Sequence, residues 1–271
     1  MSYLSRENVS LPDGLWKQID SAVVETARRI LTGRRFLPVF GPLGIGTESV
    51  SVDDAKNIAE VSKDGITVTK GRTYVELPLI NADFTLLARD LESSSKSGIP
   101  VSMSSVTAAA ETCAVNEDRM IYFGNKNFGY EGLLSASGTR KMELKDWKTG
   151  ENAFSDVAAA IGMLAEKNLY GPYALAVSPD LYVDLQRLQP STGLLESDRI
   201  ARLVDRHLYM SPVLGKKKAV LVCSNPANMD LVIGQDMITA YLEQVNLNHN
   251  FRVLETILLR IKQKDAVIVF E

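Results

Sequence analysis

Histidine and cysteine are scarce in this sequence, which contains two of each. Neither His207 nor His249 belongs to an H-E-x-x-H pattern, and Cys113 and Cys223 form no C-x-x-C pair, so the common zinc motifs are absent. Each cysteine lies in an apolar stretch, where a buried free thiol is the expected state. Two free thiols without a disulfide are typical of a cytosolic compartment.

Long apolar runs and an excess of basic residues are missing too. No run of about 18 apolar residues occurs, so we expect no membrane partner. The opening MSYLSRENVSLPDG has no apolar core flanked by basic residues, so we expect no secretory signal. The 30 basic residues are balanced by 33 acidic ones, a net charge of −3, which does not favour nucleic acid as a partner.

The stretch GPLGIGTE, residues 41–48, has the glycine spacing of a phosphate-binding loop without its lysine. A threonine stands in the lysine's place, Pro42 removes a backbone donor, and Glu48 would repel phosphate. No G-x-S-x-G motif occurs, and the glycines of GNKNFGYEG miss the dinucleotide spacing. Adjacent acids such as Glu117 and Asp118 indicate a solvated face. With no catalytic constellation left, we expect a protein that is not an enzyme.

Helices are predicted in the first two thirds of the chain and strands at its end. The apolar spacing predicts helices over residues 12–33, 82–91, 102–122, 152–168 and 193–206, and another starting at Pro179. The serine-rich residues 93–98 are expected to be a surface connection. Short strands are predicted at FLPVF and YALAV, and AVLVC, DLVIG, MITAYL, FRVLETILLRI and AVIVF predict strands that close the chain, so the fold class is α+β.

Residues 47–76 are expected to form an arm. Two polar, alternating runs, IAEVS and ITVTK, flank an Asp-Gly pair, which is a strong hairpin signal. A lone two-stranded hairpin is marginal in water, so the arm must rest on its own body or on a neighbouring subunit.

Seven motifs in a fixed order carry a resemblance to a known family. They are W-x-x-I-D from residue 16, GRRF from 33, GP-x-G from 41, ELPLI with DFTL from 76, GYEGLL from 129, YGPYALAVSPDLY from 170 and IGQDMITAY from 233. In this order the sequence resembles, from end to end, the encapsulin shell proteins. These are relatives of the tailed-phage major capsid proteins and were once labelled linocin-type bacteriocins.

The resemblance implies the tailed-phage major-capsid fold. A peripheral domain would comprise residues 1–46 with the N-terminal helix, 77–124 with a long spine helix, and 221–271 with the closing strands. The extended loop would be the β-hairpin arm at 47–76, and the axial domain would be residues 125–220. GPLGIG would then be the turn that leads from a strand into the arm.

The resemblance also implies a function. The chain would assemble in the cytoplasm into a closed icosahedral homo-oligomer of sixty subunits, a bacterial nanocompartment. It would enclose a cargo enzyme, ferritin-like (iron storage) or a peroxidase, held by the cargo's C-terminal targeting peptide. A phage or prophage capsid protein is the alternative, although such proteins commonly carry a scaffolding segment, whereas this chain starts almost at once with a body helix. A hydrolase is disfavoured by the missing nucleophile and base.

In the family, a cargo tail docks between the N-terminal helix and the strands near the G-Q-D segment. The positions of this sequence that we assign to that site are Ile30, Leu31, Arg34, Asp236, Met237 and Tyr241. The apolar ones would form a shallow groove, and the two charged ones would bind the peptide backbone or a charged tail residue. The alternative is that the apolar residues are ordinary core and that the two charges pair with each other.

A second candidate site is the segment that resembles the loop lining the family's five-fold pore. Its residues are Gln189, Pro190, Ser191, Thr192, Gly193, Leu194, Leu195 and Glu196; an ordinary surface loop is the alternative. Some family members hold a flavin against a tryptophan in the helix after DFTL. Here that helix reads LLARDLES without a tryptophan, so we expect neither flavin nor another cofactor.

Overall fold

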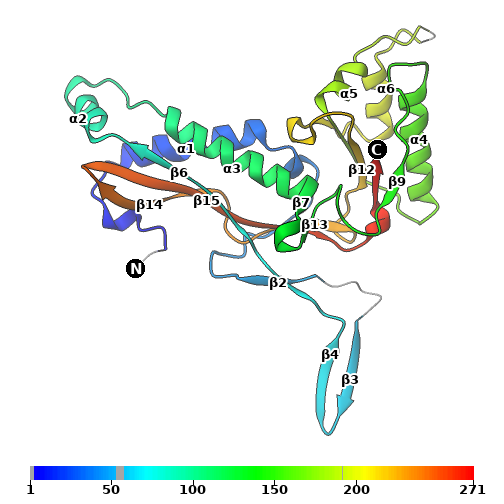
Figure 1. The fold of residues 1–271 in the computed structure, drawn as a ribbon, viewed down its shortest axis with the longest axis horizontal. Helices are drawn as coiled ribbons and strands as arrows, with labels where there is room; N and C mark the ends of the chain where they lie inside the picture. The colour runs from blue at the N-terminus through cyan, green and yellow to red at the C-terminus, as the bar shows by residue number, and fades with distance from the viewer. Residues whose placement is uncertain (1–2, 53–57, 191) are drawn as a thin grey trace.

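The structure, a computed structural model, describes residues 3–52, 58–190 and 192–271. Its larger sheet, the body sheet, is built around the 14-residue strand β15 (Figure 1). The strands run in the order β1 (Val39–Phe40), β13 (Met229–Ile233), β15 (Asn248–Ile261) and β14 (Ile238–Val245), and β6 (Leu79–Leu86) also pairs with β15. Only β1 and β13 are parallel; the other pairs are antiparallel.

Two long helices cover one face of the body sheet. Helix α3 (Ser104–Phe123) lies against β6 and β15, and α1 (Asp13–Ile30) lies against α3 and β14. Helix α1 turns Leu15, Ile19 and Val23 inward, because residues four apart lie on one face of a helix. The predicted long helix is confirmed, and the predicted first helix ends three residues early, at Ile30. No helix in the described ranges is long and apolar enough to cross a membrane.

The helix predicted over residues 82–91 is wrong. Residues up to Leu86 belong to β6, and the helix α2 begins at Ala88 and continues to Ser97 through most of the expected connection. In β6, Ile80, Phe84 and Leu86 are buried and every second residue is exposed or half-buried, which is the period of a strand and not of a helix. Helix α2 has no buried residue, so apolar spacing could not mark its position.

A second sheet, the axial sheet, forms the other end of the molecule (Figure 1). Its order is β11 (Leu208–Met210), β10 (Tyr173–Val177), β12 (Ala219–Cys223), β16 (Val267–Phe270) and β9 (Arg140–Met142). Helices α4 (Asn152–Ala165), α5 (Pro179–Asp184) and α6 (Glu196–Leu203) accompany it, and α6 is shorter than the predicted 193–206. The expected domain boundary at residue 220 falls inside β12, and β16 joins the axial sheet although it comes last in the chain.

The arm has a base and a tip. At the base, β2 (Ser49–Ser51) pairs with β5 (Tyr74–Glu76), and Val50 and Leu77 pack on Val232 and Leu258 of the body sheet. The tip is the predicted hairpin, β3 (Ala59–Lys63) and β4 (Ile66–Lys70), joined by Asp64 and Gly65 at φ 53° and 76°. It projects away from both sheets (Figure 1), and every residue of β3 is exposed. The base therefore rests on its own body, and the tip does not.

Short elements complete the described chain. They are β7 (Gly124–Asn125) with β8 (Tyr130–Glu131) and the 3-10 turns η1 (Arg6–Asn8), η2 (Gly33–Arg35), η3 (Lys126–Phe128), η4 (Pro212–Leu214) and η5 (Lys264–Ala266). The GPLGIG segment leaves β1 and is fastened to the end of β13, since the N–H groups of Leu43 and Gly44 donate to the carbonyls of Ile233 and Gly234.

Candidate functional site

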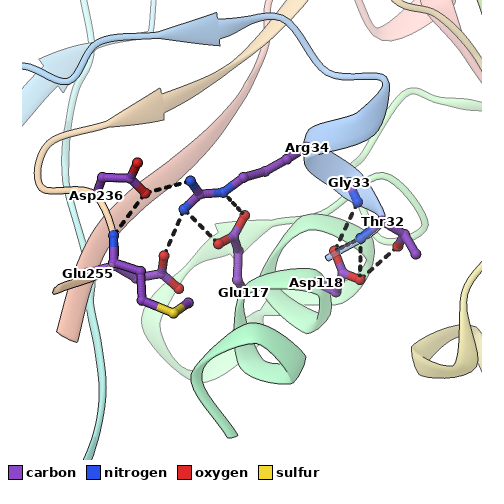
Figure 2. Close-up of polar contacts among 8 residues, drawn as sticks. Thr32, Gly33, Arg34, Glu117, Asp118, Asp236 and Glu255 are labelled. Atoms are coloured by element: carbon purple, nitrogen blue, oxygen red, sulfur yellow. Dashed lines mark hydrogen bonds and ion pairs between the residues drawn. The ribbon is translucent and has the colours of Figure 1, made fainter. Parts of the chain in front are cut away.

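The site begins where α1 ends and the chain turns against α3. Asp118 of α3 accepts hydrogen bonds from the backbone N–H groups of Thr32 (3.0 Å) and Gly33 (2.9 Å) and from the Thr32 hydroxyl (2.7 Å) (Figure 2). A Cβ atom at position 33 would lie 2.5 Å from Ile121 Cδ1, so a larger residue would force the buried Ile121 side chain to shift. The GRRF motif thus locks the turn after α1 onto α3.

The predicted solvated face at Glu117 and Asp118 is wrong, because both side chains are buried. Both carboxylates accept hydrogen bonds from the turn after α1. Asp118 accepts them from backbone N–H groups, and Glu117 accepts them from the side chain of Arg34. Burial raises the pKa of Asp118, although the N–H groups of Gly33 and Thr32 oppose this shift. Adjacent residues of a helix point in different directions, so Glu117 and Asp118 could not both be buried if only one side of α3 were covered. Here both sides of α3 are covered, and both side chains are buried.

Arg34 of η2 is bonded to three other structural elements. Its Nε and Nη2 donate to the carboxylate of Glu117 at 2.7 and 2.8 Å, Nη2 also donates to Glu255 Oε2 at 2.8 Å, and Nη1 donates to Asp236 Oδ1 at 2.6 Å (Figure 2). Burial by itself lowers the pKa of Arg34, but the hydrogen bond and charge of Glu117 and the charge of Glu255 outweigh it and raise the pKa overall. The guanidinium is therefore a permanent cation joining η2, α3, β15 and the turn after β13.

That turn, residues 234–237, is held by Thr256. The N–H of Gln235 donates to Thr256 Oγ1 at 2.7 Å, and a Cβ atom at Gly234 would lie 2.4 Å from the same oxygen, which explains the glycine of the IGQD motif. Asp236 Oδ1 accepts the N–H of Met237 at 2.8 Å, so the carboxylate is fixed in place. The turn thus presents Asp236 and Met237 beside the end of α1.

Between α1 and this turn lies a groove of about 380 Å³. Its lining residues come from α1, from the segment after it that includes η2, and from the 234–237 turn. They are Val23, Val24, Ala27, Arg28, Leu31, Arg34, Arg35, Asp236 and Met237. The floor is apolar, and Val24 is 41% exposed although it is aliphatic. The rim is charged, with Arg28 and Arg35 from the α1 side and Asp236 opposite. An apolar floor with fixed polar groups at its edge suits a short extended peptide.

The structure brings four of the six assigned residues to this groove: Leu31, Arg34, Asp236 and Met237. Ile30 packs beside them on Ala27, Leu31 and Ala114 without lining the groove. Tyr241 lies apart in the core: its ring contacts Phe251, and its N–H donates to the Leu4 carbonyl. The two charges do pair with each other, as the alternative held, but both also line the groove.

Sequence reasoning missed five lining residues (Val23, Val24, Ala27, Arg28 and Arg35) and two buried acids. Val24 and Arg28 precede Leu31 by seven and three positions, so the spacing of one helix face would have found them. Glu117 and Glu255 carried no such signal, because they meet Arg34 only in the folded chain. In the described part of the chain, no three side chains of the metal-binding types are grouped to hold a metal ion.

The loop assigned to the pore has a buried base and an exposed tip. Gln189 and Glu196 are buried; Glu196 accepts the N–H of Phe154 at 3.3 Å and pairs with Arg199 at 3.1 Å, so it fastens the start of α4 to α6. The exposed residues are Pro190, Thr192 and Gly193, while Leu194 and Leu195 are half-buried, and Ser191 lies outside the described residues. Among the described residues of this loop, the exposed ones therefore lie at the tip.

The overall architecture is shared with shells and capsids. A virus-like particle protein from Pyrococcus furiosus superposes with a TM-score of 0.77 at 23% identity, covering 95% of this chain and 99% of that chain. The capsid protein of Myoviridae phage XM1 superposes with a TM-score of 0.61 at 14% identity, covering 89% and 91%. The fold is therefore the tailed-phage capsid fold, as the sequence motifs implied.

Sequence comparison then defines the family. The family described as "Encapsulating protein for peroxidase" matches residues 1–258. The type 1 encapsulin shell protein EncA of Myxococcus xanthus is 36% identical over 276 residues, covering 99% of this chain and 96% of that protein. The chain belongs to this encapsulin family and is a shell protein.

Proposed function

We propose that copies of this chain, sixty in the smallest icosahedral form, close into a cytoplasmic shell. We further propose that a cargo enzyme is held on its inner wall by a short C-terminal tail in the groove at the end of α1. The groove carries the proposal: the exposed Val24 and the half-buried Met237 lie beside three arginines and the carboxylate of Asp236, which is fixed in place. The family description names a peroxidase, which makes that class the first cargo to test.

Such a tail would bind weakly alone, because a groove of about 380 Å³ takes only a few side chains. An oligomeric cargo presents several tails at once, and linked binding events multiply the effective affinity by roughly 10²- to 10⁴-fold. Firm retention of the cargo therefore needs no deep pocket.

The test is a double variant, Val24→Asp with Met237→Asp, co-expressed with a peroxidase that carries a C-terminal targeting tail. Both side chains line the groove, and the new charges would meet the apolar part of the tail. We expect intact particles with little cargo by electron microscopy and gel analysis. The matched control is Val245→Asp, which changes an equally exposed valine outside the groove. Unchanged loading in intact particles of the double variant would place docking elsewhere, and the particle images also give the subunit number.

A further inference from the structure

Beneath the groove, two buried acids share one nitrogen atom. Glu117 Oε2 and Glu255 Oε2 both accept from Arg34 Nη2, each at 2.8 Å, and neither side chain is exposed to solvent. Asp236 uses the same guanidinium through Nη1. Three acids therefore depend on one cation, and a fully ionised cluster carries uncompensated negative charge in the protein interior.

The second carboxylate oxygen of Glu255 indicates which group of the cluster takes up a proton and so removes the excess negative charge. Oε1 is buried and finds no hydrogen-bond donor in the described part of the chain. An ionised oxygen in such a place is strongly unfavourable, because nothing replaces the water it has lost. A proton on the Glu255 carboxyl removes this cost and makes it a hydrogen-bond donor beside Glu117.

We propose that Glu255 is protonated at neutral pH, that it donates to Glu117, and that this proton is a pH-sensitive lock on the groove. The lock joins η2 and the 234–237 turn, which carry Arg34 and Asp236 of the groove wall, to α3 and β15. It is a property of the subunit itself and does not depend on what the groove binds.

The surroundings of Glu255 favour the protonated state. The titratable and charged groups that face it are Glu117 and Cys113 from α3, Arg34 from η2 and Asp236 from the turn after β13. Burial and the charge of Glu117 raise the pKa of Glu255 well above its usual range, and Arg34 only partly opposes them. Burial also raises the pKa of Cys113 to about 12, so this thiol stays neutral beside the pair.

The lock gives stability a defined dependence on pH. Glutamate in the unfolded chain titrates near 4.5, so the folded protein binds the proton more tightly than the unfolded chain does. The stabilisation is complete below that pH and is lost as the pH rises towards the raised pKa of Glu255. Across this window the unfolding equilibrium constant increases by up to about tenfold per pH unit. At higher pH Arg34 holds two ionised buried acids, and the groove wall loosens.

The experiment follows thermal unfolding of assembled wild-type and Glu255→Gln particles from about pH 5 to about pH 9. Glutamine keeps the shape of the side chain, stays neutral and can donate to Glu117. We expect a shallower loss of stability with pH in Glu255→Gln, which then exceeds the wild type in alkaline solution. Glu196→Gln is the control, since Glu196 is equally buried but is paired with Arg199; we expect it to be less stable throughout, with the wild-type slope.

Infrared spectroscopy gives a second measurement that needs no variant to assemble. Wild-type particles with isotope-labelled glutamate should show the carbonyl band of a neutral carboxylic acid at neutral pH, and alkaline solution should remove it. An absent band, or equal pH slopes for the wild type and Glu255→Gln, overturns the proposal. In that case Glu255 is an ordinary ionised partner of Arg34.

Discussion

Asp20 accepts both forked hydrogen bonds of Arg6, at 2.9 and 2.7 Å. Arg6 also lies over the ring of Trp16, 4.5 Å from its centroid, and donates to the carbonyl of Thr239 in β14. The W-x-x-I-D motif therefore fastens the segment before α1 to the body sheet, and its isoleucine, Ile19, lies in the core.

Asp20→Asn tests this fastening. The pair is partly exposed, so we expect a loss of only roughly 0.2–1 kcal/mol in the free energy of unfolding. Because the variant frees Arg6, the segment before α1 should be cut faster by protease than in the wild type. Glu25→Gln removes an exposed charge from the same helix and should leave cleavage unchanged. Equal cleavage of all three proteins would contradict the assigned role.

Gly33→Ala tests the close approach of the α1 end to α3. The new methyl group would overlap Ile121 Cδ1, so we expect destabilisation of roughly 1–3 kcal/mol. Gly14→Ala is the control, because a Cβ there meets nothing within 4 Å and alanine favours a helix. Chemical denaturation of dissociated subunits measures both; a neutral Gly33→Ala would show that the contact is loose.

The arm tip should be completed by a neighbouring subunit. Val61 and Val68 lie opposite each other and are 41% and 54% exposed, so the tip has an apolar face that its own chain leaves uncovered. We expect Val61→Lys with Val68→Glu to keep the hairpin through an opposite-charge pair but to prevent closed particles. Ser62→Lys with Thr67→Glu alters the other face of the same hairpin and should assemble more nearly as the wild type does.

Size-exclusion chromatography and negative-stain imaging measure assembly of both double variants. Normal closed particles from the Val61 and Val68 variant would show that this face makes no essential contact. Deletion of residues 50–72 should have a more severe effect, leaving small oligomers or aggregates, because it also removes Val50 from the arm base.

Crosslinking tests whether the tip of the loop at Thr192 meets a symmetry axis. We expect Thr192→Cys particles treated with a bifunctional thiol reagent to give a ladder of products ending at five linked subunits. The background should be low, because Cys113 and Cys223 are both buried. Val245→Cys is the exposed control. A ladder equally long in the control, or none for Thr192→Cys, would remove the loop from the axis.

The sequence predicted the fold well where each element has its own local pattern. The Asp64-Gly65 turn and helix α3 are examples, since a turn with positive φ angles favours an Asp-Gly pair and a long buried helix shows a recognisable apolar pattern. It failed at β6, where an alternating strand leads directly into a helix. Residues 82–86, the second half of β6, were predicted as the start of that helix, although their burial alternates as in a strand.

The site was predictable only in part for a different reason. Leu31 and Met237 are apolar residues next to recognisable motifs, so the sequence could assign them to one site, and both line the groove. Glu117 and Glu255 are 138 residues apart, and only the packing of α3 on β15 brings them to one arginine. Nothing local distinguishes such acids from surface charges, so the solvated face was the natural but incorrect prediction.

The position of β15 in the chain has a consequence for the timing of synthesis. Strand β6 pairs with residues 249–256 of β15, and the axial sheet needs β16, so the two sheets are completed only after β15 and β16 have been translated. At about 5–20 residues per second, the N-terminal half waits many seconds for its partners. A nascent chain on the ribosome therefore cannot present a finished subunit surface. We therefore expect assembly to start only from chains in which β15 and β16 have already paired with the rest of the subunit.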